Sequence, residues 1–229
     1  MLEELKEKVL NANLDLVKFN LVTLTWGNVS GIDREKGLVV IKPSGVDYEK
    51  IKAKDMVVVD LNVKKIEGNL NPSSDTPTHV ELYKAFPQIG GISHSHSEYA
   101  TIFAQASMEI PCFGTTHADH FNGPVPVTRF LTEEEVNSGY ELNTGKIIAE
   151  RFKDLDPESV PAILVAGHAS FAWGKDPEDS VNNNLVLERV AKMALSSLAL
   201  NPELKDLPAY IQKKHYERKH GDNAYYGQK

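Results

Sequence analysis

Two histidines stand two residues apart in the segment His94-Ser95-His96. Alternate side chains of an extended strand point to the same side, so both imidazoles can reach one metal ion. His168, which closes the apolar, strand-like run 162–167, and Asp75, which ends a Ser-Ser-Asp run, add a third imidazole and a carboxylate. This donor set suits a divalent cation of the zinc type. The pair alone is also compatible with two polar residues on a solvated strand face.

A second group of residues has the chemistry of an anion site. Lys42 supplies a positive charge, Ser44 a hydroxyl and Gly45 an unobstructed backbone amide. Ser73 and Ser74 precede a predicted helix start, and the N-terminus of a helix favours an anion. The sequence therefore indicates a phosphate cradle, although an ordinary turn with two capping serines would use the same residue types.

Periodicity predicts the elements that must position these groups in the first half of the chain. Residues 22–41 are typical of strands with a turn at 33–37, and residues 56–61 are typical of a further strand. A helix is predicted to begin at Thr76-Pro77 and to lead to the strand with the histidine pair. An N-terminal helix is indicated by apolar residues at helical spacing, namely Leu5, Val9, Ala12 and Leu16.

Capping signals predict helices in the second half. Thr132 and Glu135 form a capping-box pattern, Asp176 opens a long helix, and a last helix ends near residues 220–221. Grouped strands with helices at both ends and on the flanks predict an α/β fold, a three-layer sandwich with a central, mainly antiparallel sheet flanked by helices. No linker, repeat or low-complexity tract interrupts it, so we expect a single domain over residues 1–229.

Composition limits the classes of function. The 229 residues, 41% of them apolar, can bury a substantial core. A net charge of −7 argues against general binding to nucleic acid or to an anionic membrane, but a local basic pocket for a phosphorylated small molecule remains compatible. The one cysteine, Cys112, excludes an internal disulfide and is expected to be buried. No signal core or membrane-spanning stretch is evident, so we expect a cytoplasmic location.

Taken together, the motifs resemble the class II aldolase family, which includes the adducin head, and within it the sugar-phosphate 4-epimerases. The matching segments run nearly from end to end: 26–30, 42–46, 72–79, 94–96, 114–119, His168 with 171–174, and the tail from His215 to Gln228. The resemblance implies interconversion of L-ribulose 5-phosphate and D-xylulose 5-phosphate, as in arabinose or ascorbate catabolism. It implies a sugar phosphate as the only ligand besides the metal.

The resemblance also implies roles for individual residues. It implies one zinc ion per subunit, held by His94, His96 and His168, with Asp75 as a further ligand or a close partner. The positions that match phosphate contacts in the family are Gly27, Asn28, Ser44, Gly45, Ser73 and Ser74, with Lys42 beside them. The positions that match the proton-transfer groups are Asp119 and Tyr226, with Thr115, Glu141 and His215 close by. In the family these groups come from a neighbouring subunit, which implies a homotetramer with active sites at subunit interfaces.

The implied reaction explains the need for a metal. Carbon 4 of the substrate carries no acidic proton, so its inversion requires a carbon–carbon bond to break. The resemblance implies retro-aldol cleavage between carbons 3 and 4, rotation of the aldehyde and re-addition to its opposite face. The metal would stabilise the developing negative charge, and the phosphate grip would retain the aldehyde fragment.

Three alternatives are compatible with parts of the sequence. An aldolase of the same family, such as an L-fuculose-phosphate aldolase, would release the two fragments; related aldolases carry glutamate where this chain has Asp75, which favours the epimerase. A non-catalytic scaffold similar to the adducin head would not need every proposed ligand. A zinc hydrolase is disfavoured because no separate general base for water is evident. Manganese or cobalt could occupy the same donor set.

Overall fold

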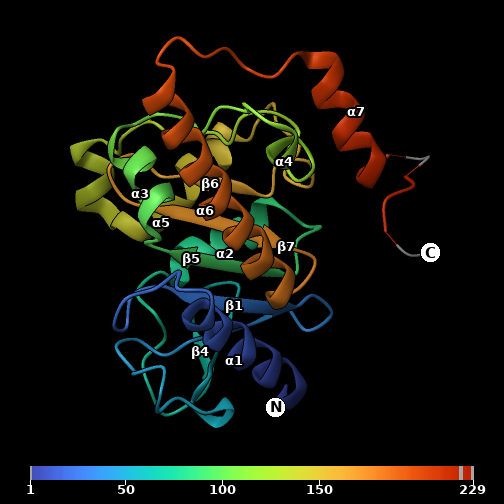
Figure 1. The fold of residues 1–229 in the computed structure, drawn as a ribbon. Coiled ribbons are helices and arrows are strands. Elements are labelled where there is room, and N and C mark those ends of the chain that lie inside the picture. The colour runs from blue at the N-terminus through green and yellow to red at the C-terminus, as the bar shows by residue number, and fades with distance from the viewer. Residues whose placement is uncertain (1, 222–223, 228–229) are drawn as a thin grey trace.

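The computed structural model describes residues 2–221 and 224–227 of the chain. Within these residues seven strands form one sheet in the order β4-β3-β2-β1-β5-β7-β6, and neighbouring strands are antiparallel throughout (Figure 1). The strands are β1 (Asn28–Asp33), β2 (Leu38–Ile41), β3 (Val57–Asp60), β4 (Lys65–Glu67), β5 (Gly91–Ser95), β6 (Ala162–Leu164) and β7 (Ser170–Gly174). The helices are α1 (Glu3–Lys18), α2 (Thr76–Ala85), α3 (Glu98–Gln105), α4 (Thr115–Ala118), α5 (Glu133–Arg151), α6 (Pro177–Leu200) and α7 (Ala209–His220), with a 3-10 turn at Ala53–Asp55.

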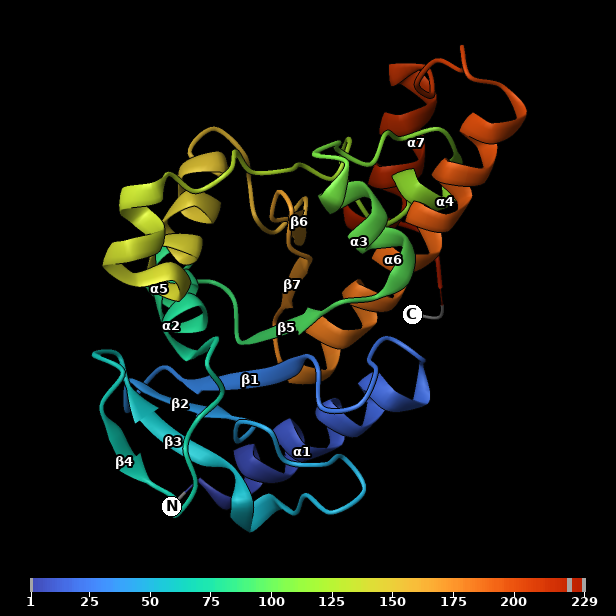
Figure 2. The same cartoon turned by 90° about the vertical axis from the view of Figure 1, so that its left-hand side faces the viewer.

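Helices cover both faces of the sheet, with α1 and α6 on one face and α2 and α5 on the other (Figure 2). Strand β1 shows how the alternation of side chains sorts these contacts. A side chain at Gly31 would meet Leu5 of α1 and Pro177 of α6 at 2.8 Å each. The hydroxyl of the preceding residue, Ser30, instead hydrogen-bonds with Nδ1 of His79 in α2 at 2.7 Å. The predicted three-layer α/β sandwich with an antiparallel central sheet is therefore confirmed.

An aromatic cluster holds the ends of α2 and α5 against β7, next to one edge of the sheet. The ring centroid of Phe86, at the end of α2, lies 5.5 Å from that of Phe152, at the end of α5. Trp173 of β7 lies 5.1 Å from the first and 5.0 Å from the second. All three rings are buried. Burial of such a side chain contributes about 1.5–3 kcal/mol relative to exposure, so the cluster is a major part of the core.

Helix α3 follows β5 almost directly, and a carboxylate from α6 fixes its start. The side chain of Glu188 accepts hydrogen bonds from the backbone N–H groups of Tyr99 at 3.0 Å and Ala100 at 2.9 Å. The first N–H groups of a helix have no partner within the helix, and negative charge is favourable beside them. Glu188 therefore anchors the chain just past the end of β5, close to the histidine pair.

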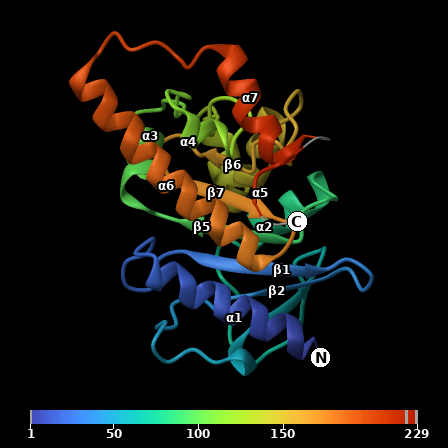
Figure 3. The same ribbon diagram turned by 45° about the vertical axis from the view of Figure 1, so that its right-hand side comes forward.

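Helix α7 stands away from the sheet, beside α4 (Figure 3). Residues 201–208 carry the chain across from α6, and the N–H of Leu207 donates to the carbonyl oxygen of Cys112 at 2.8 Å. Cys112 is buried, as predicted. None of the residues of α7 is buried, so this helix contributes little to the core.

The predicted helix starts are confirmed. Helix α2 begins at Thr76, and α6 has Asp176 as its N-cap, with the carboxylate accepting from the N–H of Asp179. Helix α5 begins with the predicted capping box between Thr132 and Glu135. Among the helices of residues 2–221, none is both long enough and apolar enough to cross a membrane.

Two strand predictions are wrong in their bounds. Residues 22–27 form turns and irregular structure rather than a strand, and Leu24 has a φ of 53°, which a strand does not accommodate. The apolar run 162–167 leaves the strand after Leu164, and the chain reverses at Gly167, where φ is 72°. The apolar residues of this run are buried by packing, so their composition is strand-like beyond the end of the strand.

Candidate metal centre and anion cleft

Strand β5 directs His94 to one face of the sheet, and His96 follows one residue past the end of the strand. The hydroxyls of Ser93 and Ser95 point to α6, where they donate to the carbonyl oxygen of Ser180 at 2.8 Å and to Oδ1 of Asn184 at 2.9 Å. His94 lies between these serines, so its side chain points to the opposite face. The Nε2 atoms of His94 and His96 are 3.2 Å apart. The two-residue spacing therefore brings the imidazoles together, as the sequence predicts.

The ring of His94 is held from two sides. Its Nδ1 atom donates to the carbonyl oxygen of Ser170 in β7 at 2.8 Å, and its ring stacks on Phe171 with centroids 4.3 Å apart. An N–H at Nδ1 leaves the lone pair at Nε2, the atom that faces His96. Such an outer hydrogen bond is the usual way in which a ligating histidine is oriented.

His168 completes the group from the turn between β6 and β7. Its ring centroid lies 5.0 Å from that of His94 and 4.9 Å from that of His96. One ligand atom from each of the three lies within 4.8 Å of the others. Phe130 packs against the turn, and a side chain at Gly167 would meet its ring at 2.7 Å. The turn therefore requires glycine, both for its positive φ and for this contact.

The chemistry of the three histidines fits a divalent cation. Burial, with a smaller contribution from the neighbouring imidazoles, lowers the pKa of His96 and of His168 to about 4. Both rings are therefore neutral near pH 7 and offer lone pairs, as metal ligands must. The Nδ1 atom of His168 is buried and has no hydrogen-bond partner among the described residues. A cation with a preference for nitrogen donors suits this group.

Asp75 lies in the same cleft, just before α2. Its Oδ2 atom accepts a hydrogen bond from the side-chain amide of Asn28 at 2.7 Å. Burial acts to raise the pKa of Asp75, but His94, His79 and the bond from Asn28 outweigh it, so the pKa is below its ordinary value. The carboxylate is not a member of the close group of ligand atoms found among the described residues. Direct ligation by Asp75 stays a prediction.

The cleft has a volume of about 480 Å³ and contains all the residues predicted to bind phosphate. Segments 42–45 and 71–75 meet at its floor, where the N–H of Ser73 donates to the carbonyl oxygen of Lys42 and the N–H of Ser44 to that of Asn71, both at 3.0 Å. The lining residues are Thr25, Trp26, Gly27, Asn28, Lys42, Pro43, Ser44, Gly45, Ser73, Ser74, Asp75, His94, His96 and His168.

Lys42 gives the cleft a positive charge that is not ion-paired to any carboxylate of the described residues. Its side chain is 2% exposed, and its Nζ atom lies 4.6 Å from the centroid of the Tyr48 ring. No ion pair to Lys42 occurs among residues 2–221 and 224–227. Burial lowers the pKa of Lys42 to about 8. A buried ammonium without a partner is costly, and an anion in the cleft would offset that cost.

The residues predicted to transfer protons lie elsewhere. Asp119, at the end of α4, accepts hydrogen bonds from Nε of Arg218 at 2.8 Å and from Nδ1 of His215 at 3.1 Å. Thr115 belongs to the same short helix. Tyr226 lies with its ring centroid 5.0 Å from Cζ of Arg218. None of these residues lines the cleft, so within one subunit the structure gathers them into a separate cluster.

Glu141 lies apart from that cluster, in the part of α5 that touches α2. Its carbonyl oxygen accepts from the hydroxyl of Thr78 at 2.7 Å. The neighbouring Tyr140, which the sequence analysis missed, has its ring centroid 6.1 Å from that of His168. Gly139, with a φ of 143°, interrupts the helix just before it. That glycine inside a predicted helix was the available signal of a special position.

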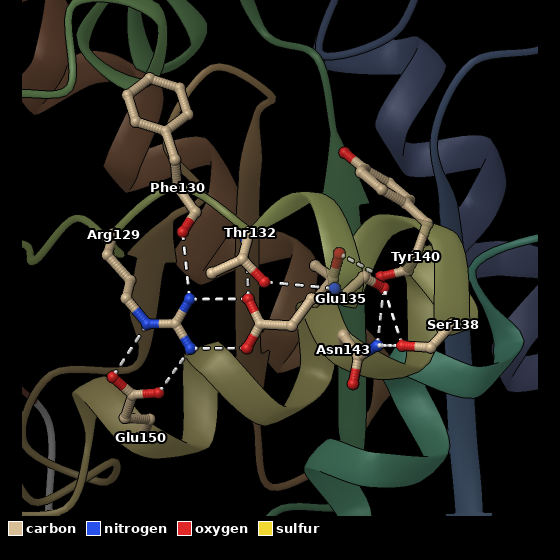
Figure 4. Close-up of polar contacts among 9 residues, drawn as sticks. Arg129, Phe130, Thr132, Glu135, Ser138, Tyr140, Asn143 and Glu150 are labelled. Atoms are coloured by element: carbon tan, nitrogen blue, oxygen red, sulfur yellow. Dashed lines mark hydrogen bonds and ion pairs between the residues drawn. The ribbon is translucent and has the colours of Figure 1, made fainter.

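Arg129 ties the loop before α5 to both segments of the interrupted helix. It donates to both carboxylate oxygens of Glu135 at 2.7 Å and to those of Glu150 at 3.1 and 2.9 Å. Figure 4 shows this ion-pair cluster on one side of α5 and the side chain of Tyr140 extending from the other end. The cluster is exposed, so it orients the loop more than it stabilises the fold.

Comparisons with known proteins identify a family and solved structures of similar fold. Residues 7–195 match the family model described as Class II Aldolase and Adducin N-terminal domain. A solved L-fuculose 1-phosphate aldolase is 28% identical, with a TM-score of 0.79 over 94% of this chain and 95% of that chain. YgbL from Klebsiella pneumoniae, a putative aldolase/epimerase/decarboxylase, is 26% identical, with a TM-score of 0.72 over 93% and 99%. The L-fuculose-1-phosphate aldolase from Thermus thermophilus, 22% identical, shares the fold with a TM-score of 0.63 over 89% and 98%.

Proposed function

The chain belongs to the class II aldolase and adducin N-terminal domain family, and on this premise we propose that it is a zinc-dependent 4-epimerase for L-ribulose 5-phosphate and D-xylulose 5-phosphate. One observation carries the proposal: a single cleft holds three close imidazoles and a buried lysine that has no ionic partner within the described part of the chain. The imidazoles suit a cation and the lysine suits an anion. A sugar phosphate, with oxygens at one end and a phosphate at the other, matches both.

The anion end of the cleft supplies several donors for a phosphate. Lys42 provides the charge, Ser44 and Ser73 provide hydroxyls, and Gly45 provides an N–H. The N-terminus of α2 adds its positive end, since this helix begins at Thr76. A side chain at Gly45 would meet nothing within 4 Å, so the space beside this residue is open. These groups would retain the phosphorylated fragment while it rotates.

The metal end would hold one zinc ion through His94, His96 and His168, with Asp75 as a fourth ligand or a close partner. A bound divalent cation supplies Lewis-acid stabilisation of the negative charge that develops on the substrate oxygens. The protein's own contribution is orientation. Ser170 and Phe171 fix the ring of His94, and Asn28 fixes the carboxylate of Asp75.

The reaction that we propose breaks the bond between carbons 3 and 4, rotates the aldehyde and forms the bond again on the other face. Cleavage requires the hydroxyl on carbon 4 to lose its proton, and re-addition requires a proton to return. Asp119 and Tyr226 are the proposed acceptor and donor. Neither lines the cleft of its own subunit. We therefore propose that a neighbouring copy brings them in, in a homotetramer with active sites at subunit interfaces.

An aldolase is the second candidate, because a solved L-fuculose 1-phosphate aldolase is 28% identical over nearly the whole chain. Such an enzyme would release the two fragments. Asp75 favours the epimerase, since the family's aldolases carry the longer glutamate there. Its carboxylate is also engaged by Asn28, which suits a fixed role beside the metal better than a mobile proton carrier.

The first experiment measures products from chelator-stripped protein with and without added zinc. L-ribulose 5-phosphate should yield D-xylulose 5-phosphate only when zinc is present. Accumulation of free glycolaldehyde phosphate, or cleavage of L-fuculose 1-phosphate, would favour the aldolase instead. A zinc-loaded oligomer that acts on neither substrate would contradict both candidates and favour a non-catalytic scaffold.

A second experiment tests the shared site by complementation. Lys42→Met should disable the cleft, and Asp119→Asn should disable the cluster on α4 and α7. Each variant alone should have its kcat/KM reduced about tenfold or more. Dissociating and reassembling a mixture should restore part of the activity, because some interfaces then combine an intact cleft with an intact cluster. No recovery in confirmed mixed oligomers would contradict a site shared between subunits.

A further inference from the structure

One guanidinium contacts both residues that are proposed to move protons. Arg218, near the end of α7, donates from Nε to Oδ1 of Asp119 at 2.8 Å and from Nη2 to Oδ2, so two parallel bonds hold the carboxylate. The same guanidinium lies over the ring of Tyr226, with Cζ 5.0 Å from the ring centroid. No motif in the sequence singles out Arg218.

The backbone of Arg218 holds the tail in the same place. Its carbonyl oxygen accepts hydrogen bonds from the N–H groups of Tyr225 at 3.0 Å and Tyr226 at 3.1 Å. The ring of Tyr226 also lies under Lys219, whose Nζ atom is 4.6 Å from the ring centroid. Side chain and backbone of Arg218 therefore join α4, the end of α7 and the tail into one unit.

We infer that Arg218 is a positioning residue of the proposed enzyme, because it sets the Asp119 carboxylate and the Tyr226 ring in one fixed arrangement for delivery to a neighbouring cleft. The inference rests on the proposed function, since it takes Asp119 and Tyr226 as the proton-transfer groups. Arginine suits this task because its planar fork binds a carboxylate with two bonds while its face lies on an aromatic ring. Lysine presents a point charge and cannot do both.

The charges around Asp119 predict how the loss of Arg218 would change the pKa of this carboxylate. The titratable and charged groups that face it are Arg218, His215, Lys219, His220 and His120. Partial burial acts to raise the pKa of Asp119, but the bonds from Arg218 and His215 outweigh it and hold the pKa below its ordinary value. Without Arg218 this pKa should rise, so the carboxylate form should be lost at a higher pH.

The test compares Arg218→Gln and Arg218→Lys with Lys213→Gln. Lys213 is a matched control on the same helix, with a side chain 74% exposed and a 3.7 Å pair to Glu217. We expect kcat to fall about tenfold or more in both Arg218 variants while KM changes about twofold or less, as for loss of a positioned proton-transfer group. The acid limb of the kcat/KM profile should move to higher pH in Arg218→Gln. Lys213→Gln should behave as the wild type.

Zinc content, oligomeric state and melting temperature are measured on every variant. A merely structural arginine would lower kcat together with zinc content or assembly and leave the pH profile in place, and that result overturns the inference. So does an Arg218→Lys variant with wild-type kcat and pH profile. In a double-mutant cycle, Asp119→Asn should mask most of the loss from Arg218→Gln; fully additive losses also overturn the inference.

Failure of the inference and failure of the proposed function give different results. A wild type that converts L-ribulose 5-phosphate, together with insensitive Arg218 variants, refutes the inference alone. A zinc-loaded wild type that forms neither the epimer nor cleavage products refutes the proposed function and, with it, the inference. Guanidinium ion at low millimolar concentration offers a further readout, since it should restore part of kcat in Arg218→Ala but not in Asp119→Asn.

Discussion

The cleft beside β5 and the Asp119 cluster, which comprises Asp119, His215, Arg218 and Tyr226, lie in different parts of the fold. The cleft belongs to the sheet, where His94 is held by Ser170 and Phe171 of a buried neighbouring strand. The Asp119 cluster depends on α7, a helix without a buried residue. The half proposed to hold a metal therefore lies in the core, and the half proposed to meet another subunit lies on a projecting helix.

Removing one imidazole should give the largest loss of activity. It should disable the cleft and leave the Asp119 cluster unchanged. We expect His96→Asn to lose bound zinc and to lower kcat/KM roughly a thousandfold, since several kcal/mol of charge stabilisation depends on the cation. The fold should persist, since the His96 side chain is only partly buried. Elemental analysis and a coupled assay check this prediction. Full zinc content in the variant would contradict the assignment of His96 as a ligand.

Substitutions in the Asp119 cluster should lower the rate of the reaction without changing the metal content. We expect Asp119→Asn and Tyr226→Phe to lower kcat about a hundredfold or more, because each removes a proposed proton-transfer group. Zinc content should equal that of the wild type, since neither residue lines the cleft. Steady-state kinetics and elemental analysis on the same samples test both halves of the prediction. Near wild-type turnover in both variants would contradict the proposed roles.

Lys42→Met should affect substrate binding more than chemistry. Loss of a charge-assisted hydrogen bond costs about 1.5–3 kcal/mol, so kcat/KM should fall roughly 10- to 100-fold. The unliganded protein should be no less stable, because the variant removes a buried charge without an ionic partner. Steady-state kinetics should show the fall in kcat/KM, and thermal melts should show a melting temperature that is not lowered. Lys50→Met is the control, because Lys50 is 77% exposed and should be silent in both measurements.

The same lysine predicts a pH dependence. With a pKa of about 8, Lys42 carries its charge below that pH and loses it above. Substrate capture by the free enzyme should therefore decline as pH rises through about 8, which appears as a falling alkaline limb of kcat/KM. That limb should be absent in Lys42→Met and present in Lys50→Met. An alkaline limb that persists unchanged in Lys42→Met would assign it to another group.

Deletion of residues 209–229 should have the smallest effect on folding. The deleted helix buries none of its residues, so we expect the free energy of unfolding to fall by about 1 kcal/mol, or about 2–4 °C in melting temperature. The measurement is a melt of unassembled subunits, with zinc content as the companion. Loss of zinc or of cooperative unfolding would show that α7 supports the sheet and would remove the contrast between the two regions.

Local chemistry made much of the fold predictable. The two-residue spacing in His94-Ser95-His96 brings the two imidazoles together at the end of β5, and capping residues mark the starts of α5 and α6. These signals lie within a few residues of the features that they predict. The phosphate cradle was predicted because segments 42–45 and 73–75 each carry recognisable anion-binding types, although only the structure brings them together.

Other features depend on contacts between distant segments and leave no local signal. Helix α4 has four residues, too few for a hydrophobic period. Arg218 meets Asp119 across 99 residues of sequence. The start of α3 is fixed by Glu188, which lies in another helix. The residues alone offer His168 as a possible third imidazole, and the resemblance was needed to assign it as a ligand, because the turn that carries it looks like a continuation of the apolar strand.

The antiparallel pairing of β5 with β7 has a consequence for the synthesis of the protein. The hydroxyl of Ser170 donates to the carbonyl oxygen of Ser95, a partner 75 residues earlier in the chain. A nascent chain that has emerged as far as His94 and His96 must be extended to His168 before the third imidazole can join them. Cation capture is thereby deferred until most of the sheet exists. Growing chains on the ribosome should bind the ion weakly, and maturation of the holoenzyme should follow folding rather than guide it.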